Sequence, residues 1–289
     1  MRLEIVTRGT DLLAECPVWL AAERHLLRVD VTRQAILERD VATGAEHRRS
    51  VHAPVGFALP ARRSGLVAGI GRELHVLPGD SAPRVLAAVE PDRPANRFND
   101  AACDSRGRLW AGTMSTERRS GEAALYRIGA DGEVVPAVRR ATISNGLDWD
   151  LDATRLYYVD SATQRVDAID FDLDRGRLGT RRTFAAIDAG DGLPDGLTVD
   201  AEGGVWVALF GGGAIRRYHP DGRLDAEIRL PVTNPTSMAF GGVDLTDLYV
   251  TSARHRLSAD QLAREPLAGS LLRLRPGVRG RLPHRFGDG

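Results

Sequence analysis

Apolar and polar residues alternate in short runs along most of this 289-residue chain, which is the period of half-buried β-strands. The clearest runs are 145–149 and 195–199, and each opens on Asn or Asp followed by Gly. A second strand rich in aromatic residues follows each of them, at 155–159 and 204–208. Because these strands are short and closely spaced, the pattern predicts antiparallel sheets.

The same unit recurs along the chain. Matching runs open 40 to 50 residues apart, at Glu15, Val55, Asn99, Asn145, Asp195 and Thr236. Further strands follow in each unit, separated by turns such as 42–44, 130–132 and 220–222 that contain Gly. Four-stranded units at this spacing are typical of a β-propeller. We therefore predict an all-β fold, a single six-bladed β-propeller of four-stranded antiparallel blades over residues 1–276.

The two ends of the chain have different expected roles. The N-terminal run 3–6 alternates like a strand and is expected to complete the last blade, whose own third strand is 270–274. Pairing of the N-terminal strand with the last blade would close the ring and leave only short sheet edges. Residues 258–264 could form a short helix with Ser258 as its N-cap. Residues 277–289, rich in Gly, Pro and Arg, are expected to form a loose tail.

Charge and composition argue against several classes of function. The chain has 39 basic and 39 acidic side chains, which gives no support for a nucleic-acid or membrane-surface partner. Every basic residue is Arg, so the Lys amine of Schiff-base enzymes and Walker-type phosphate sites is missing. No run approaches the roughly 18 apolar residues of a membrane span, and the N-terminus lacks the apolar run of a signal peptide. We expect a soluble, cytoplasmic monomer.

Motifs for other chemistries are missing from the sequence. Cys16 and Cys103 are the only cysteines, too few for a disulfide framework or a Cys-based zinc site, and are expected to be buried and reduced. The seven His residues show no zinc-ligand spacing such as HExxH and are expected in loops or on blade surfaces. No GxSxG motif indicates a serine hydrolase. The run 211–213 has no helix behind it, which favours a hairpin over a phosphate-binding loop.

The residues that open the inner strands form the candidate site. Inner strands of a propeller line a central channel, so these side chains are expected to converge on one mouth. Glu15, Asn145 and Asp195 offer two carboxylates and an amide, which suit Ca²⁺, Mg²⁺ or Mn²⁺ more than a classical zinc site. Asn and Asp also begin strands because they suit turns. The common repeat phase of the three nevertheless favours a shared site.

Three further polar residues belong to the third unit. Arg97 and Asn99 precede its inner strand and can point into the mouth, where Arg97 could bind a substrate oxygen or carboxylate. Glu117 follows the second strand in a loop that could fold over the mouth. The alternative interpretations are a surface Arg and a solvated loop carboxylate.

Five motifs occur in order along the chain: Glu15-Cys16-Pro17-Val18-Trp19, Arg97-Phe98-Asn99-Asp100, Gly112-Thr113-Met114, Ser144-Asn145-Gly146-Leu147-Asp148-Trp149 and Pro194-Asp195-Gly196. With these motifs, the stretch from about residue 13 to residue 253 resembles the SMP-30/gluconolactonase/regucalcin-like (LRE-like region) family. The chain departs from the family at Cys16, where Gly or Ser is more common.

The resemblance implies a set of site residues. It implies one divalent cation, held by Glu15, Asn145 and Asp195. Sugar-lactone binding is implied for Arg97, Asn99 and Glu117. Asp195 is also implied as the proton acceptor and donor.

Three functions follow as hypotheses. The leading one is a divalent-metal-dependent hydrolase that opens a sugar lactone such as gluconolactone to the aldonic acid, with Ca²⁺ favoured and Zn²⁺, Mn²⁺ or Mg²⁺ left open. The second is a non-catalytic Ca²⁺-binding propeller with a regulatory or interaction role, which would not need Arg97, Asn99 and Glu117. The third is a metal-dependent hydrolase of an aryl lactone or organophosphate, with an apolar rim supplied by Val55, Phe57 and Phe210.

Overall fold

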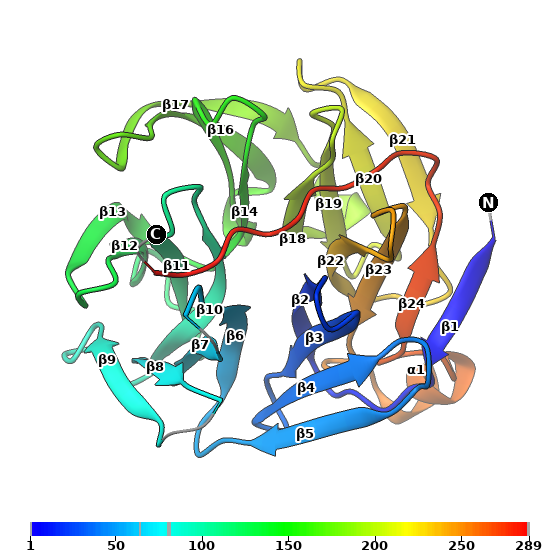
Figure 1. Cartoon of the computed structure of the whole chain (residues 1–289). Coiled ribbons are helices and arrows are strands. Elements are labelled where there is room, and N and C mark those ends of the chain that lie inside the picture. Colours follow the sequence, from blue (N-terminus) through cyan, green and yellow to red (C-terminus); the bar gives the residue numbers. More distant parts are fainter. Residues whose placement is uncertain (1, 64, 80–81, 288–289) are drawn as a thin grey trace.

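The computed structural model describes residues 2–63, 65–79 and 82–287. These residues form six four-stranded antiparallel sheets arranged as blades around a central channel (Figure 1). The prediction of an all-β, six-bladed propeller is therefore confirmed. Within the described ranges, no helix has the length and apolar character needed to cross a bilayer.

Five blades use consecutive strands, with the innermost first. Blade I contains β2 (Ala14–Leu20), β3 (His25–Asp30), β4 (Ala35–Asp40) and β5 (Glu46–Ser50). Blade II contains β6 (Val55–Pro60), β7 (Leu66–Ile70), β8 (Glu73–Leu77) and β9 (Arg84–Ala88). Blade III contains β10 (Asn96–Cys103), β11 (Leu109–Ser115), β12 (Ala123–Ile128) and β13 (Val134–Ala141). Blade IV contains β14 (Ser144–Trp149), β15 (Arg155–Asp160), β16 (Arg165–Asp172) and β17 (Arg177–Ala186). Blade V contains β18 (Leu193–Val199), β19 (Val205–Phe210), β20 (Ala214–Tyr218) and β21 (Leu224–Arg229).

Blade VI closes the ring by joining the two ends of the chain. It contains β22 (Pro235–Gly241), β23 (Asp247–Ser252), β24 (Leu271–Leu274) and, as its outermost strand, β1 (Leu3–Thr7). β1 pairs antiparallel with β24, and Glu4 forms an ion pair with Arg273 across the pair. The expected role of the N-terminal strand is confirmed, because β1 covers an edge of β24 that would otherwise be open.

Helical structure is limited to short segments. The helix expected near residue 258 is α1 (Ala259–Arg264), and Ser258 caps it through a reciprocal capping box with Gln261. Single 3₁₀ turns lie at η1 (Ser161–Thr163) and η2 (Ala189–Asp191).

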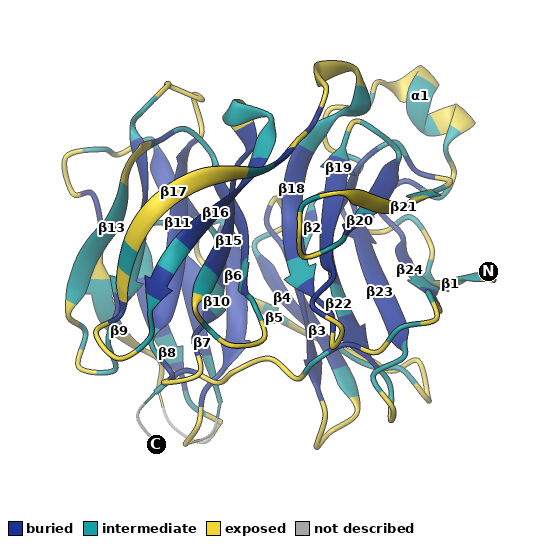
Figure 2. Ribbon diagram, turned by 90° about the horizontal axis from the view of Figure 1, so that it is seen from above, coloured by how far each residue is buried: buried dark blue, intermediate teal, exposed yellow. Residues whose placement is uncertain are grey.

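Burial decreases from the channel outward. The inner and second strands are mostly buried, whereas the outermost strands β5, β17 and β21 are largely exposed (Figure 2). Apolar residues of neighbouring blades pack against each other, and the largest cluster spans blades I to III. The core therefore lies between blades, since a lone blade cannot bury both of its faces.

A bulge interrupts each inner strand near its start. The register against the second strand shifts between Glu15 and Val18, Val55 and Phe57, Phe98 and Ala101, Ser144 and Leu147, Pro194 and Leu197, and Pro235 and Met238. A bulge leaves extra residues outside the ladder and turns their side chains away from the regular alternation. The polar residues aligned in the sequence lie at these irregular points.

The C-terminal segment differs from its expectation. Residues 277–289 were expected to be loose, but the described part, 277–287, runs across the channel opening (red in Figure 1). Arg281 donates to Asp148 Oδ1 at 3.1 Å and to the Trp149 carbonyl at 2.8 Å. Phe286 is buried, and its backbone N–H donates to the Pro60 carbonyl. Partners elsewhere in the ring hold this segment without regular secondary structure, which composition alone does not reveal.

Candidate functional site

A cavity of about 490 Å³ opens at the mouth where the inner strands begin. Its lining includes Glu15 from β2, Arg97 and Asn99 from β10, Asn145 from β14 and Asp195 from β18. Five of the six side chains proposed from sequence are thus brought together from four blades. Glu15, Asn99, Asn145 and Asp195 each lie at the bulge near the start of their inner strand, and Arg97 precedes the bulge of β10.

Glu117 lies outside this lining. It is exposed in the turn after β11, and its carboxylate is 2.6 Å from the guanidinium of Arg119. The flanking residues Thr116 and Arg118 line the cavity instead. Glu117 is therefore at the rim, and its role in substrate binding stays a prediction.

Asn145 and Asp195 form a directly bonded pair. The amide nitrogen of Asn145 donates to Asp195 Oδ1 and, at 3.0 Å, to Ser161 Oγ. Both side chains are almost fully buried, with exposed fractions of 5% and 6%. Because Ser161 belongs to η1 immediately after β15, blades IV and V jointly fix the pair.

Arg97 and Asn99 form a second fixed unit. Arg97 Nη1 donates to Asn99 Oδ1 at 3.0 Å and to the Phe98 carbonyl at 2.8 Å. Asn99 Nδ2 donates to the Ser144 carbonyl at 3.0 Å, which ties blade III to blade IV. These bonds orient a guanidinium and an amide at the cavity wall before any ligand arrives.

Negative charge is concentrated beside the channel. Burial raises the pKa of Glu15 well above its ordinary value, and the charges of Asp195 and Asp100 raise it further. The pKa of Asp195 is likewise raised, first by burial and then by Asp100. Burial also raises the pKa of Asp100 to about 6. Arg97 and Arg118 oppose this effect on Asp195, and burial lowers the pKa of Arg97 itself to about 10.

These residues fit a divalent cation. Ionised Glu15 and Asp195 repel each other in a buried setting, and a cation between them would remove that cost. The amide oxygen of Asn145 is a third hard donor, and such donors suit Ca²⁺, Mg²⁺ or Mn²⁺. The fit rests on the donor set and on the raised pKa values of the two carboxyl groups.

Three ionisable residues of the cavity were not found from sequence: Arg118, His255 and Arg256. They lie on loops outside the repeated strands, so repeat phase gives no signal for them. Arg118 and Arg256 both adopt left-handed backbone conformations, with φ of 54° and 67°. The pKa of Arg118 is lowered, first by burial and then by the charge of Arg256. The pKa of His255 is also lowered, first by burial and then by the charges of Arg256 and Arg118.

The apolar part of the cavity differs from the expected rim. Phe210 lines the cavity, but Val55 and Phe57 are fully buried in the core and are not part of the lining. Other loops and strands supply the remaining apolar residues, which are Leu13, Val31, Pro54, Met114, Ile143 and Leu193.

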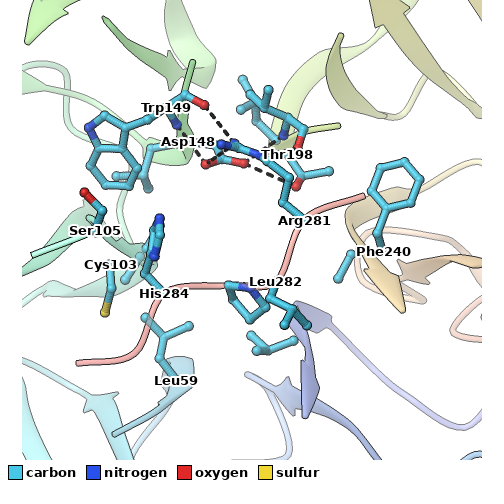
Figure 3. A pocket seen from close by; sticks show the side chains of 18 of the residues that line it. Leu59, Cys103, Ser105, Asp148, Trp149, Thr198, Phe240, Arg281, Leu282 and His284 are labelled. Atoms are coloured by element: carbon cyan, nitrogen blue, oxygen red, sulfur yellow. Dashed lines mark hydrogen bonds and ion pairs between the residues drawn. The ribbon is translucent and has the colours of Figure 1, made fainter. Parts of the chain in front are cut away.

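A second cavity of about 490 Å³ lies at the other mouth, among the ends of the inner strands. The C-terminal segment covers it, and Figure 3 shows Arg281 and His284 projecting from that segment toward the blades. Cys16 and Cys103 line it as free, buried thiols, as expected. Burial raises the pKa of both thiols, which keeps them protonated and unreactive. None of the six predicted site residues contributes to this lining.

Comparison with known proteins gives a family match. Residues 13–254 match the family model "SMP-30/Gluconolactonase/LRE-like region". The chain is 38% identical to regucalcin of Xenopus laevis over 294 residues, which covers 99% of this chain and 98% of that protein.

Two solved structures are similar over nearly the whole chain. A calcium-binding protein, regucalcin, of Agrobacterium tumefaciens superposes with a TM-score of 0.93 at 27% identity, covering 98% of this chain and 96% of the other. A luciferin-regenerating enzyme gives a TM-score of 0.93 at 29% identity, covering 99% of both chains.

Proposed function

We propose that this chain, which belongs to the SMP-30/gluconolactonase/LRE-like family, is a divalent-metal-dependent lactonase that opens a sugar lactone to the aldonic acid. One observation carries the proposal. The oxygen donors of Glu15, Asn145 and Asp195 share a cavity with the hydrogen-bonding groups of Arg97 and Asn99. A site for a cation alone would not need the second pair.

The protein groups have separate roles in the proposed reaction. Arg97 and Asn99 bind lactone oxygens, and their mutual hydrogen bond fixes the distance between the two contacts. Asp195 accepts a proton from the attacking water and returns it to the departing ring oxygen. Glu15 and Asn145 would bind the cation together with Asp195, and Asn145 also orients the Asp195 carboxylate through a hydrogen bond. A bound divalent cation supplies Lewis-acid polarisation of the lactone carbonyl.

The positive charge around the cavity favours a substrate that carries an anionic group. Arg118 and Arg256 line the cavity, and neither guanidinium forms an ion pair within the described residues. With Arg97, they bring three guanidinium groups to a cavity whose lining carboxylates are Glu15 and Asp195. A carboxylate or phosphate on the lactone would pair with the two unpaired groups.

The test is hydrolysis of a panel of aldonolactones by metal-stripped protein, with each divalent cation added back. We expect turnover only with an added cation, and a loss of about 10²- to 10⁴-fold in kcat for Asp195→Asn. Asp188→Asn is the matched control, since Asp188 is exposed and its side chain makes no capping bond. Near-normal turnover by Asp195→Asn would remove Asp195 from the proposed role.

A non-catalytic cation-binding role is the second candidate. It is favoured by the similarity to a bacterial regucalcin described as a calcium-binding protein. It predicts that Ca²⁺ raises the melting temperature while no lactone of the panel is hydrolysed with any cation. The two candidates are thus separated by turnover, because both require the cation to bind.

A further inference from the structure

Two histidines and a glutamate come together at blade II. Glu73 and His75 are two residues apart on β8 and therefore lie on the same face of the strand. His52 belongs to the connection between β5 and β6. One potential ligand atom of each residue lies within 4.8 Å of the other two. The imidazole centroids are 5.4 Å apart, and His75 Nε2 is 3.1 Å from Glu73 Oε2.

The backbone holds these residues in place. The Val51 N–H donates to the Gln34 carbonyl at 2.9 Å, and the Gly71 N–H donates to the Pro54 carbonyl at 2.8 Å. The His52 loop is therefore tied to blade I at one end and to the β7–β8 turn at the other. His75 is buried, with 8% of its surface exposed, between Ala68 and Val85 of the adjacent strands. Little ordering would be needed for a ligand to bind all three side chains.

The charges nearby also favour a cation. In the described ranges, the ion-pair partner of Glu73 is His75, and no guanidinium pairs with its carboxylate. The neighbouring Arg72 turns its guanidinium away and donates to the Glu90 carbonyl at 2.9 Å. The Glu73 carboxylate is therefore free to bind a metal ion without displacing an arginine.

We infer that His52, Glu73 and His75 bind a borderline divalent cation of the Zn²⁺ type. Two imidazole nitrogens and one carboxylate oxygen are typical zinc ligands, and a water would complete a tetrahedral site. The donor set differs from the oxygen-only set of the channel mouth, which suits harder cations. The fold does not require this cluster, since His52 is exposed and contributes nothing to the core.

Binding here would stabilise the folded chain. The cation would join the loop that connects blades I and II to the third strand of blade II, and it would bind only when both are in place. Pro54, two residues beyond His52, lines the channel-mouth cavity. The loop that carries His52 and Pro54 therefore connects the proposed zinc site to the channel mouth.

The test is a calorimetric titration of the full chain with Zn²⁺ in the presence of excess Ca²⁺, which competes for the oxygen-donor site at the channel mouth. We expect the wild type to bind one Zn²⁺. In metal sites, losing a residue that only hydrogen-bonds to a ligand lowers the metal affinity about 10- to 100-fold. Because His52→Gln removes a direct ligand, it should weaken Zn²⁺ binding at least about tenfold. His47→Gln is the matched control, because His47 is an exposed residue of the adjacent strand β5.

A second readout identifies the ligands directly. In the ¹⁵N spectrum of labelled imidazoles, Zn²⁺ should shift the signals of two of the seven histidines, and one of the two should vanish in His52→Gln. Equal affinities for wild type and His52→Gln, shifts at other histidines, or no Zn²⁺ uptake by the wild type would each overturn the inference. Both measurements report binding, so their outcome is independent of lactone turnover.

Discussion

The position of a residue within the inner-strand bulge decides which mouth of the channel its side chain reaches. Asn99 lines the cavity at the starts of the strands, whereas its neighbour Asp100 lines the opposite cavity. Glu15 and Cys16 divide in the same way. Asn145 and Asp195 are each followed by Gly, because the adjacent blade leaves no space there. A Cβ on Gly196 would lie 2.2 Å from Ser237 Oγ and 2.7 Å from Ser237 Cα.

The first prediction concerns this close approach. Gly196→Ala should lower the free energy of unfolding by about 1–3 kcal/mol, since blade VI must move to admit the methyl group. Gly190→Ala is the control, because no atom lies within 4 Å of a Cβ at that position. Urea unfolding of the two variants measures the difference. Equal stabilities would show that the bulges are not packed as tightly as the structure indicates.

The position of a residue within the repeated unit explains which cavity residues could be predicted from sequence and which could not. The common position of Glu15, Asn145 and Asp195 at one mouth could be predicted because they recur at one point of a regular unit. Arg118 and Arg256 could not, because they belong to loops that differ from blade to blade. Glu117 immediately precedes Arg118, which lines the cavity, and its role in substrate binding stays a prediction.

At the scale of elements, strands were predicted well and the irregular C-terminal segment was not. Alternation and turn residues indicated the strands of each blade, and the alternating run at the N-terminus indicated β1. Residues 277–287 carry no period, and their order depends on partners distant in the sequence, as in the Arg281–Asp148 pair. Gly280 packs against Phe240, where a Cβ would lie only 1.9 Å from the Phe240 Cβ. Such contacts belong to tertiary structure and leave no local pattern.

The second prediction tests that segment. Deleting residues 277–289 removes the buried Phe286 side chain, worth about 1.5–3 kcal/mol, together with the hydrogen bonds of Arg281. We expect a lower melting temperature, with most of the loss reproduced by Phe286→Ala in the full chain. Turnover of any lactone at 25 °C should be retained, because the segment covers the mouth opposite the proposed site. An unchanged melting temperature would show that the segment does not stabilise the ring.

For the whole molecule, the distribution of charge matters more than its total. The net charge is zero, yet Arg97, Arg118 and Arg256 gather at one mouth of the channel. Many other arginines form ion pairs away from this mouth, as Arg217 does with Asp200, Glu202 and Asp225. A bound divalent cation would add to the positive potential at the mouth. With a cation bound between Glu15 and Asp195, the three guanidinium groups would make this mouth positive, which composition alone cannot reveal.

The third prediction follows from this opening and rests on the proposed lactonase activity. Between two lactones of the same ring size, one neutral and one bearing a carboxylate, the anionic one should have the higher kcat/KM. Arg256→Gln should remove most of that preference while leaving the neutral lactone almost unchanged, and Arg264→Gln, an exposed arginine of α1, should have no effect. Raising the ionic strength to about 0.15 M shortens the screening length to about 8 Å, so it should slow only the anionic substrate. Hydrolysis of both lactones at equal rates would retain the lactonase and exclude anion recognition by the arginines, whereas hydrolysis of neither would count against the activity itself.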